Sequence, residues 1–365
     1  MTSSSSENDF DLNSYDYSLP ESMIAQTPVD PRDSSKLMVL SRNGLPIADD
    51  ITRNLKKYIS ANTAIILNDV KVIPGRFYAK KATGGKAEVL ILSILDEKSA
   101  EVLLNSRRPI KKGDCLHYNL DEIDFSINII SDTGKGGIRI AEFSNFKLTP
   151  ENLLQIGLPP LPPYIKRDEN DFRFENDRRR YQTIYAEKGQ AAAAPTAGLH
   201  FTQNLIDELA SDFEIHKITL NVGLGTFQPV HETDIRKHLM HKEYFEMSSD
   251  TAKAIQSAKL KGQNILAIGT TTVRTLESIA SHDFNPDYLQ GETDIFIYPS
   301  YKYKFVDSIM TNFHLPKSTL IMMIAAFIGR ENILKAYESA IKKNYRFYSY
   351  GDAMLIQSKQ LHFTM

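Results

Sequence analysis

The sequence predicts a mixed α/β protein whose main domain is interrupted by a small antiparallel β domain, either a barrel or a sandwich. From Tyr181 onward, strand and helix patterns alternate, which is typical of an α/β domain. Residues 72–146 differ, because short strand patterns recur there at close spacing, glycines separate them, and no convincing helix pattern is present. We therefore predict a discontinuous α/β domain, residues 1–70 and 150–365, with the β domain inserted at residues 71–149.

The first segment of the main domain is expected to contain two helices and two strands. Pro20 stands at the first position of a short helix pattern that ends before Pro28. A strand at residues 37–40 precedes apolar residues at helical spacing in 51–59, and residues 64–67 are a strand of the buried type. Polar residues follow directly at the carboxyl end of that strand.

The inserted domain has glycine-rich turns and clusters of basic side chains. Its expected strands cover residues 87–95, 100–105, 115–118, 125–130 and 137–143. Lys71, Arg76, Lys80 and Lys81 lie close together near its start. These side chains are compatible with an ordinary solvated face of a barrel and also with a surface that binds phosphate groups.

The second segment of the main domain follows a proline-rich linker, residues 157–163, and a charged stretch, residues 168–180, that we expect to be mobile. Thr202 is expected to cap a helix in which Leu205 and Leu209 share one face. Further strands are expected at 215–222, 264–268, 295–298, 309–313 and 353–357, and further helices at 251–260, 271–280, 318–328 and 332–342.

The bulk composition excludes several classes of protein. The 365 residues are 42% hydrophobic and 24% charged, and the net charge of −2 indicates no global basic field for nucleic acid, so any RNA contact must rest on local patches. The single Cys115 excludes an intramolecular disulfide and a cysteine-based zinc cluster. No signal-peptide pattern is present, and the longest apolar run, residues 320–328, falls well short of the roughly 20 residues of a membrane span. We expect a cytoplasmic protein.

The most unusual stretch is Ala191-Ala-Ala-Ala-Pro-Thr-Ala-Gly-Leu-His-Phe201, which begins with eight residues of very small side-chain volume. Core strands favour β-branched and aromatic residues, and surface loops favour charged or turn-forming ones. Small residues instead let a ligand approach the backbone closely, and Gly198 would also permit a positive φ. Tight packing of a helix against a sheet is the alternative, but the polar Thr196 and His200 within the run favour a binding site.

Two other strand ends are rich in glycine or threonine. Gly223 and Gly225 end one expected strand without completing a dinucleotide-binding fingerprint. Thr270 and Thr271 open a helix directly after another strand, although the lysine of a P-loop is missing. The three hydroxyl groups of Thr270, Thr271 and Thr272, with free helix amides at a strand end, suit a polar ligand, and a simple capping turn is equally compatible.

Two further strand ends carry aromatic and hydrogen-bonding side chains. Asp294 precedes Phe296 and Tyr298, an arrangement that suits ribose hydroxyls and the face of a base. Asn312 and His314 follow another expected strand. A buried, satisfied histidine is the default interpretation of any one of these residues, but the recurrence of polar residues at successive strand ends favours a site.

Histidines at residues 238 and 241 could share one helix face, as in some zinc sites. The sequence has neither an HExxH motif nor supporting cysteines, so we predict no metal. His241 and Glu243 are expected to serve in hydrogen bonding or proton transfer instead.

These motifs together resemble the S-adenosylmethionine:tRNA ribosyltransferase-isomerase family of queuosine biosynthesis. The resemblance extends from about Phe10 to Ile356, with a longer basic stretch at residues 168–180 as one departure. The matching motifs are Tyr15-Asp-Tyr-Ser-Leu-Pro20, Asn68-Asp-Val-Lys-Val-Ile-Pro-Gly-Arg76, Ala193-Ala-Pro-Thr-Ala-Gly-Leu-His-Phe201, Asn221-Val-Gly-Leu-Gly-Thr-Phe227, Gly269-Thr-Thr-Thr-Val-Arg274, Thr311-Asn-Phe-His-Leu-Pro-Lys-Ser-Thr319 and Tyr350-Gly-Asp-Ala-Met354.

The resemblance implies a barrel-like mixed α/β domain with an inserted small β-barrel. It also implies that S-adenosylmethionine donates its ribosyl group to 7-aminomethyl-7-deazaguanine at the wobble position of tRNA. The ribose is isomerised to give epoxyqueuosine, and adenine and methionine leave. Such a reaction requires a general base beside the ribose carbon next to the sulfonium, and groups that hold the methionine charges away from the reacting carbons. It requires no metal.

Residue roles follow from this chemistry as hypotheses. His200, His241 and His314 are candidate proton carriers, because an imidazole titrates near neutral pH, and Glu243 and Glu277 are held in reserve. Residues expected to hold S-adenosylmethionine are Pro195, Thr196, Ala197, Gly198, Gly223, Gly225, Thr270, Thr271, Asp294, Phe296, Tyr298 and Asn312, assisted by the amide end of the helix from Thr202. Residues expected to contact tRNA phosphates are Arg76, Arg274, Lys80 and Lys81.

Two rival functions are compatible with parts of the sequence. A different nucleoside-cleaving transferase or hydrolase on the same scaffold would release adenine without requiring tRNA. A non-catalytic RNA-binding protein would bind tRNA with a steep salt dependence and would not consume S-adenosylmethionine. The small-residue run argues against the second rival, because an adaptor needs no small-molecule pocket. We expect a monomer with tRNA as its partner and no membrane contact.

Overall fold

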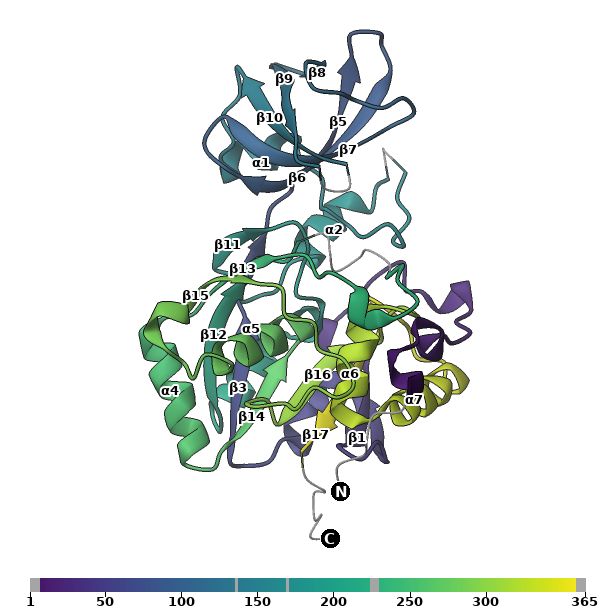
Figure 1. Cartoon of the computed structure of the whole chain (residues 1–365), viewed down its shortest axis with the longest axis vertical. Coiled ribbons are helices and arrows are strands. Elements are labelled where there is room, and N and C mark those ends of the chain that lie inside the picture. The colour runs from purple at the N-terminus through teal and green to yellow at the C-terminus, as the bar shows by residue number, and fades with distance from the viewer. Residues whose placement is uncertain (1–6, 135–136, 169–170, 224–229, 359–365) are drawn as a thin grey trace.

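The computed structural model describes residues 7–134, 137–168, 171–223 and 230–358. A large body of sheet and helices carries a smaller β-barrel at one end (Figure 1). This arrangement confirms the predicted mixed α/β fold with an inserted all-β barrel. Among the described residues, no helix is long and apolar enough to cross a membrane.

The inserted region forms a closed barrel of antiparallel strands in the order β10-β7-β6-β5-β8-β9. Alternate side chains such as Phe77, Val89 and Phe125 fill its interior, and the stacked rings of Tyr118 and Phe125 lie 4.8 Å apart. The sequence predicted all of these strands except β5, because the basic residues of β5 interrupt its strand pattern. The strands are β5 (Arg76–Lys81), β6 (Lys86–Ile94), β7 (Ser99–Ser106), β8 (Cys115–Leu120), β9 (Ile123–Asp132) and β10 (Ile138–Ser144).

The main domain is built on one nine-stranded sheet in the order β15-β13-β12-β3-β14-β16-β17-β1-β2. Strands β12, β3, β14 and β16 run parallel, so their carboxyl ends meet at one edge of the sheet. The strands are β1 (Lys36–Ser41), β2 (Pro46–Ile51), β3 (Thr63–Asn68), β12 (Glu214–Leu220), β13 (Glu243–Glu246), β14 (Asn264–Ile268), β15 (Gln290–Thr293), β16 (Ser308–Asn312) and β17 (Ala353–Gln357).

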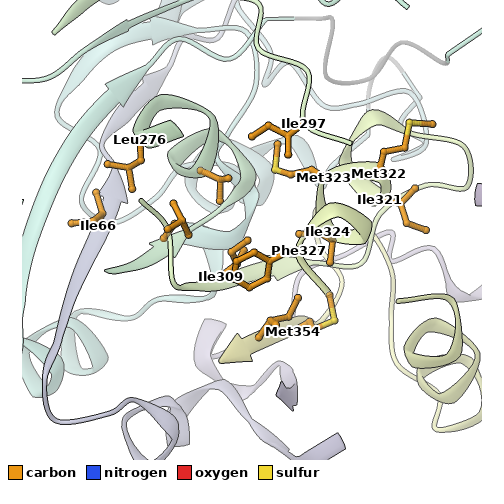
Figure 2. Packing of buried hydrophobic residues seen from close by; sticks show 14 of the residues in the cluster. Ile66, Leu276, Ile297, Ile309, Ile321, Met322, Met323, Ile324, Phe327 and Met354 are labelled. Carbon is orange, nitrogen blue, oxygen red and sulfur yellow. The ribbon is translucent and has the colours of Figure 1, made fainter. Parts of the chain in front are cut away.

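Two hydrophobic cores cover the two faces of this sheet. Along β1, Met38 and Leu40 join one core while Leu37 and Val39 join the other, which is the alternation that a strand buried on both faces requires. Figure 2 shows part of the larger core, where Ile66 of β3, Leu276 and Met354 are drawn with neighbouring side chains from other elements. This packing fixes the strand ends around which the site is built.

Helices cover the sheet and connect its strands. The sequence predicted α4, α5, α6 and α7 to within two residues at each end. The α-helices are α1 (Pro150–Ile156), α2 (Phe174–Arg180), α3 (Gln203–Ala210), α4 (Ser249–Leu260), α5 (Thr270–Ala280), α6 (Thr319–Ile328) and α7 (Arg330–Lys342).

Three local predictions are wrong. The helix expected after Pro20 is a single 3₁₀ turn, Glu21–Met23. Residues 295–298 form no strand, because β15 ends at Thr293, whose hydroxyl accepts a hydrogen bond from the Ile295 amide at 3.2 Å. Most of the stretch expected to be mobile, residues 174–180, is helix α2.

Helix α2 is held by buried ionic contacts. The Arg167 guanidinium donates to both carboxylate oxygens of Asp177, at 2.7 and 3.1 Å, and the Tyr350 hydroxyl donates to the same carboxylate at 2.9 Å. Both charged side chains are almost fully buried. A paired and hydrogen-bonded buried charge is tolerated where an isolated one is not, so a charged sequence here forms fixed structure.

The two chain segments that join the barrel to the main domain are packed against each other. Arg76 and Leu158 pair through two backbone hydrogen bonds, and the Gln182 side chain bonds both the amide and the carbonyl of Val72. At Gly157, an added Cβ would lie 1.6 Å from the Pro74 carbonyl oxygen. The contact between these segments therefore requires glycine at this position.

We predict that Gly157→Ala destabilises the protein by about 1–3 kcal/mol, the usual cost of overpacking. Gly85→Ala is the matched control, because a Cβ there meets only ordinary contacts at 3.8 and 3.9 Å. Chemical denaturation of both variants measures the free energies of unfolding. Equal stabilities for Gly157→Ala and Gly85→Ala would show that the joint between the segments is not tightly packed.

Candidate active site

An open cavity lies at the carboxyl ends of β14 and β16, beside the small-residue run. Its enclosed volume is well below the roughly 300–1,000 Å³ that is usual for ligand pockets. The cavity encloses about 50 Å³, so it is a narrow slot. Its polar lining consists of Thr196, Thr270, Thr271, Thr311, Asn312, His314, Ser318 and Ser349.

The two halves of the small-residue run serve different purposes. Ala191 ends the short strand β11 (Lys188–Ala191), and Ala191 and Ala193 pack in the main core. Residues 194–197 line the cavity, where the Thr196 hydroxyl donates to the Asn312 side-chain oxygen at 3.0 Å. The run is therefore both close-packed core and cavity wall.

Gly198 does not have the backbone conformation expected of it. It does not adopt a positive φ, and it lies outside the cavity lining. A Cβ added there would lie 2.1 Å from the Tyr185 hydroxyl and 2.8 Å from the Thr183 methyl group. Glycine is needed because a tyrosine packs directly against the backbone, and the ligand contact expected of Gly198 stays a prediction.

We expect Gly198→Ala to destabilise the protein by about 1–3 kcal/mol, because the new methyl group overlaps the Tyr185 hydroxyl. Tyr185→Phe removes that oxygen, so the double variant should recover part of the lost stability. Thermal unfolding of the wild type, both single variants and the double variant gives the coupling. Additive effects of the two substitutions would contradict this packing.

The amino-terminal end of α5 faces the cavity. Gly269 precedes the helix with φ +93°, and no side chain of the described residues caps the helix. Residues 269–271 line the cavity. The Thr271 hydroxyl accepts a hydrogen bond from the Asn68 side chain at 3.1 Å, which fixes the position of this turn. The helix amides and the positive end of the dipole suit an anionic group, at about 0.3–1 kcal/mol for an exposed contact.

The helix expected to provide this cradle was α3. Thr202 caps α3 as predicted, accepting from the Leu205 amide at 3.2 Å, but its hydroxyl donates to Asp33 at 2.9 Å and it does not line the cavity. The helix amides at the cavity therefore come from α5.

His200 is a buried histidine with both ring nitrogens occupied. The Asn312 amide nitrogen lies 3.0 Å from Nε2 and also donates to the Tyr348 carbonyl at 3.1 Å. A carbonyl only accepts, so the nitrogen of the amide faces Nε2, which must accept. Nδ1 then carries the proton and donates to the Ser35 hydroxyl at 2.7 Å. His200 thus positions Asn312 and does not itself line the cavity.

His314 lines the cavity directly. Its Nε2 lies 2.9 Å from the Thr311 hydroxyl, and its backbone amide donates to the Tyr337 hydroxyl at 2.9 Å. Across the described part of the chain, Nδ1 has no hydrogen-bond partner. Burial lowers the pKa of His314 to about 3, so the ring is neutral at physiological pH.

We predict that neither His200 nor His314 titrates between pH 5 and 8, because burial lowers both pKa values to about 3. In the unfolded chain, these histidines bind protons once the pH falls below the ordinary imidazole pKa of about 6.5. Each residue therefore lowers the free energy of unfolding by about 1.4 kcal/mol per pH unit as the pH falls from about 6.5 towards 3. Imidazole NMR signals, assigned with His200→Gln and His314→Gln, test this, and a midpoint near pH 6.5 for either residue would contradict it.

The other two residues expected to move protons lie elsewhere. Glu243 accepts from the Gly223 amide at 2.9 Å and forms a buried ion pair with Arg274. His241 is half-buried, and neither His241 nor Glu243 is part of the cavity lining. The reserve carboxylate, Glu277, accepts four hydrogen bonds, from Tyr301 and from the amides of residues 304–306. We interpret Glu277 as structural.

The expected ribose and base contacts are not at this cavity. Asp294 is exposed and lines a different, acidic pocket near the end of α5. The rings of Phe296 and Tyr298 lie 4.9 Å apart and pack against the main core. Gly223 is outside the cavity lining, and Gly225 lies outside the described residues.

The residues expected to contact tRNA phosphates differ in exposure and in the partners they already have. Arg274 is only 4% exposed and is bound to Glu243, which leaves its guanidinium little access to a phosphate. Arg76 pairs with Glu88 at 2.6 Å, and Lys81 donates to the Arg108 carbonyl. Lys80 is exposed on the barrel.

Two aromatic residues at the cavity were missed. The rings of Tyr164 and Tyr348 lie 4.7 Å apart and both line the cavity, and the Tyr164 hydroxyl is 2.6 Å from Ser349. Tyr164 directly follows the proline-rich linker, and Tyr348 lies two residues before the Tyr350-Gly-Asp motif. Their proximity to unusual sequence was the available signal.

The described residues contain no group of three His, Cys, Asp or Glu side chains placed to hold a metal ion. The cavity instead offers hydroxyls, one amide, one imidazole and an uncapped helix end. Such groups bind and orient an organic ligand with an anionic part.

An α/β body with a polar slot at the carboxyl ends of its strands has the architecture of an enzyme that acts on a small molecule. The family model described as queuosine biosynthesis protein matches residues 12–356. The chain belongs to the S-adenosylmethionine:tRNA ribosyltransferase-isomerase family of queuosine biosynthesis, whose members are transferases.

Relatives match over nearly their whole length. The S-adenosylmethionine:tRNA ribosyltransferase-isomerase of Staphylococcus haemolyticus is 46% identical, covering 94% of this chain and 98% of that protein. The enzyme of Thermosipho melanesiensis is 45% identical, with coverages of 94% and 99%. A crystal structure of S-adenosylmethionine tRNA ribosyltransferase from Thermotoga maritima shares 35% identity, with a TM-score of 0.51 over 94% of this chain and 99% of that chain.

Proposed function

We propose that the protein transfers and isomerises the ribosyl group of S-adenosylmethionine onto 7-aminomethyl-7-deazaguanine at the wobble position of tRNA. The products are epoxyqueuosine in the tRNA, free adenine and free methionine. Family membership supports the class of reaction. The slot beside residues 194–197 is the structural observation that supports binding of S-adenosylmethionine by this chain.

The slot has groups that match the parts of the donor. The amino-terminal amides of α5 suit the methionine carboxylate. The hydroxyls of Thr196 and Thr270 suit the ribose, and the rings of Tyr164 and Tyr348 offer aromatic surface for a flat base. The narrow shape favours a planar group over a globular one.

His314 is the remaining candidate for proton transfer among the three histidines, because it alone lines the slot. Its pKa of about 3 keeps the ring neutral and able to accept a hydrogen bond or a proton, but also makes it a weak base. A substrate carboxylate brought next to the ring would raise this pKa and strengthen the base. The Thr311 hydroxyl holds the ring in place at 2.9 Å.

The direct test combines the protein with S-adenosylmethionine labelled in the ribose and tRNA carrying 7-aminomethyl-7-deazaguanine. We expect label to enter the RNA while adenine and methionine appear in equal amounts. Adenine release that does not require tRNA would favour a different nucleoside-cleaving enzyme. Salt-dependent tRNA binding without consumption of S-adenosylmethionine would indicate a non-catalytic RNA-binding protein.

The histidine assignment predicts three different outcomes for alanine substitutions. His314→Ala should lower kcat by about 10²–10⁴, the usual contribution of general acid–base catalysis. His200→Ala should mainly raise the KM for S-adenosylmethionine, because Asn312 loses its support, and His241→Ala should stay within about threefold of the wild type. Near-normal kcat in His314→Ala would remove this residue from the mechanism.

A further inference from the structure

A second pocket, which we call the junction pocket, lies where the β-barrel joins the main domain. It encloses about 150 Å³, and its wall includes Ile73, Leu154 of α1 and Pro159. In Figure 1, α2 lies at this junction, between the barrel and the large sheet. The pocket is mainly apolar, and Leu154 on its rim is 56% exposed. An apolar slot of this size accommodates a flat ring.

Two positively charged side chains lie at the rim of the junction pocket. Lys71 and Arg178 both line it and both are exposed. Within the residues that the structure describes, neither side chain forms an ion pair, and the Arg178 guanidinium donates to the Leu154 carbonyl at 3.2 Å. Gln190 also lines the pocket, and over the same described residues its side-chain amide has no hydrogen-bond partner. A flat apolar wall, two exposed cations that form no ion pair within the described residues, and an amide side chain with no hydrogen bond there match a base, a phosphate and a base edge.

Tyr181 separates the junction pocket from the active-site cavity. It contributes to the junction pocket and is 2% exposed. Its hydroxyl lies beside Ala194 and Ser349, which line the active-site cavity. One aromatic side chain therefore stands between the two pockets.

We propose that the junction pocket binds a nucleotide of the tRNA anticodon loop that neighbours the modified nucleotide. The base lies against Leu154 and Pro159, and Lys71 and Arg178 bind the phosphate beside it. This inference rests on the proposed function, since it takes tRNA as the substrate. Single-stranded loops are recognised by unstacked bases held on such surfaces and by cations along the backbone.

The first test is the double charge reversal Lys71→Glu/Arg178→Glu. The probes are full-length tRNA with 7-aminomethyl-7-deazaguanine and its isolated anticodon stem–loop. We expect the Kd for both RNAs to rise at least tenfold, and the slope of log Kd against log salt to fall by about 0.7–0.9, the value for one lost phosphate contact. The Kd for S-adenosylmethionine, measured without RNA, should not change.

The matched control is Lys253→Glu/Lys335→Glu, which makes the same change in net charge with exposed lysines on α4 and α7. It should leave both RNA affinities within about twofold of the wild type, a range that includes the small effect of net charge. An equal loss of affinity in the two double variants would overturn the proposal, because it would reflect net charge alone. Unchanged RNA affinity in Lys71→Glu/Arg178→Glu would overturn it as well.

A second variant fills the pocket without changing charge. Leu154→Trp should raise the KM for tRNA at least fivefold and leave the KM for S-adenosylmethionine unchanged, and Leu260→Trp, at a residue that is 89% exposed, is its control. Normal tRNA kinetics in Leu154→Trp would contradict base binding in the pocket. Failure of the proposed function is seen separately, as absence of ribosyl transfer by the wild type.

Discussion

A line of buried hydrogen bonds from Ser35 through His200 and Asn312 to Thr196 holds the active-site cavity in shape. It joins three segments that are far apart in sequence: Ser35, the 3₁₀ turn Thr196–His200, and Asn312, which is 112 positions from His200. Each member is buried or half-buried and satisfied, so removing one leaves a partner unpaired at a cost of about 1–3 kcal/mol. That is a sizeable part of the about 5–15 kcal/mol that stabilises a typical domain. The wall at Thr196 keeps its position because this line of contacts is complete.

The same network explains why His200 is a supporting residue. A catalytic imidazole needs one nitrogen that faces the substrate, and both nitrogens of His200 are bound to protein. His314 has one nitrogen bound to Thr311, and it lines the cavity. The distinction is one of hydrogen-bond partners, because burial lowers the pKa of the two rings to the same value of about 3.

Several buried charged side chains of this protein have charged or hydrogen-bonding partners. Glu243 with Arg274, and Asp177 with Arg167, are paired inside the fold, and Glu277 is surrounded by donors. Burying such groups without partners would cost several kcal/mol each, so their value lies in holding neighbouring segments in place. By contrast, Lys71 and Arg178 stay exposed and unpaired among the described residues, which leaves them available to a partner.

The sequence predicted the repetitive parts of the structure well and the long-range contacts poorly. Strand β14 was predicted to the residue because an apolar run between polar residues is a local signal. Residues 194–197 of the small-residue run line a cavity, but Gly198 packs against Tyr185. Contacts with residues distant in the chain decide which histidine faces the cavity. They also decide whether the Arg274 guanidinium is available to a ligand, since it is paired with Glu243. No local pattern records those contacts.

The central claim is that S-adenosylmethionine binds in the slot walled by residues 194–197. The most direct measurement is calorimetric titration of S-adenosylmethionine into the wild type and into Ala194→Leu, whose longer side chain would occupy the slot, with thermal unfolding as a check on folding. We expect the variant to remain folded and to lose at least thirtyfold in affinity. A folded Ala194→Leu variant that binds S-adenosylmethionine as tightly as the wild type would contradict the claim.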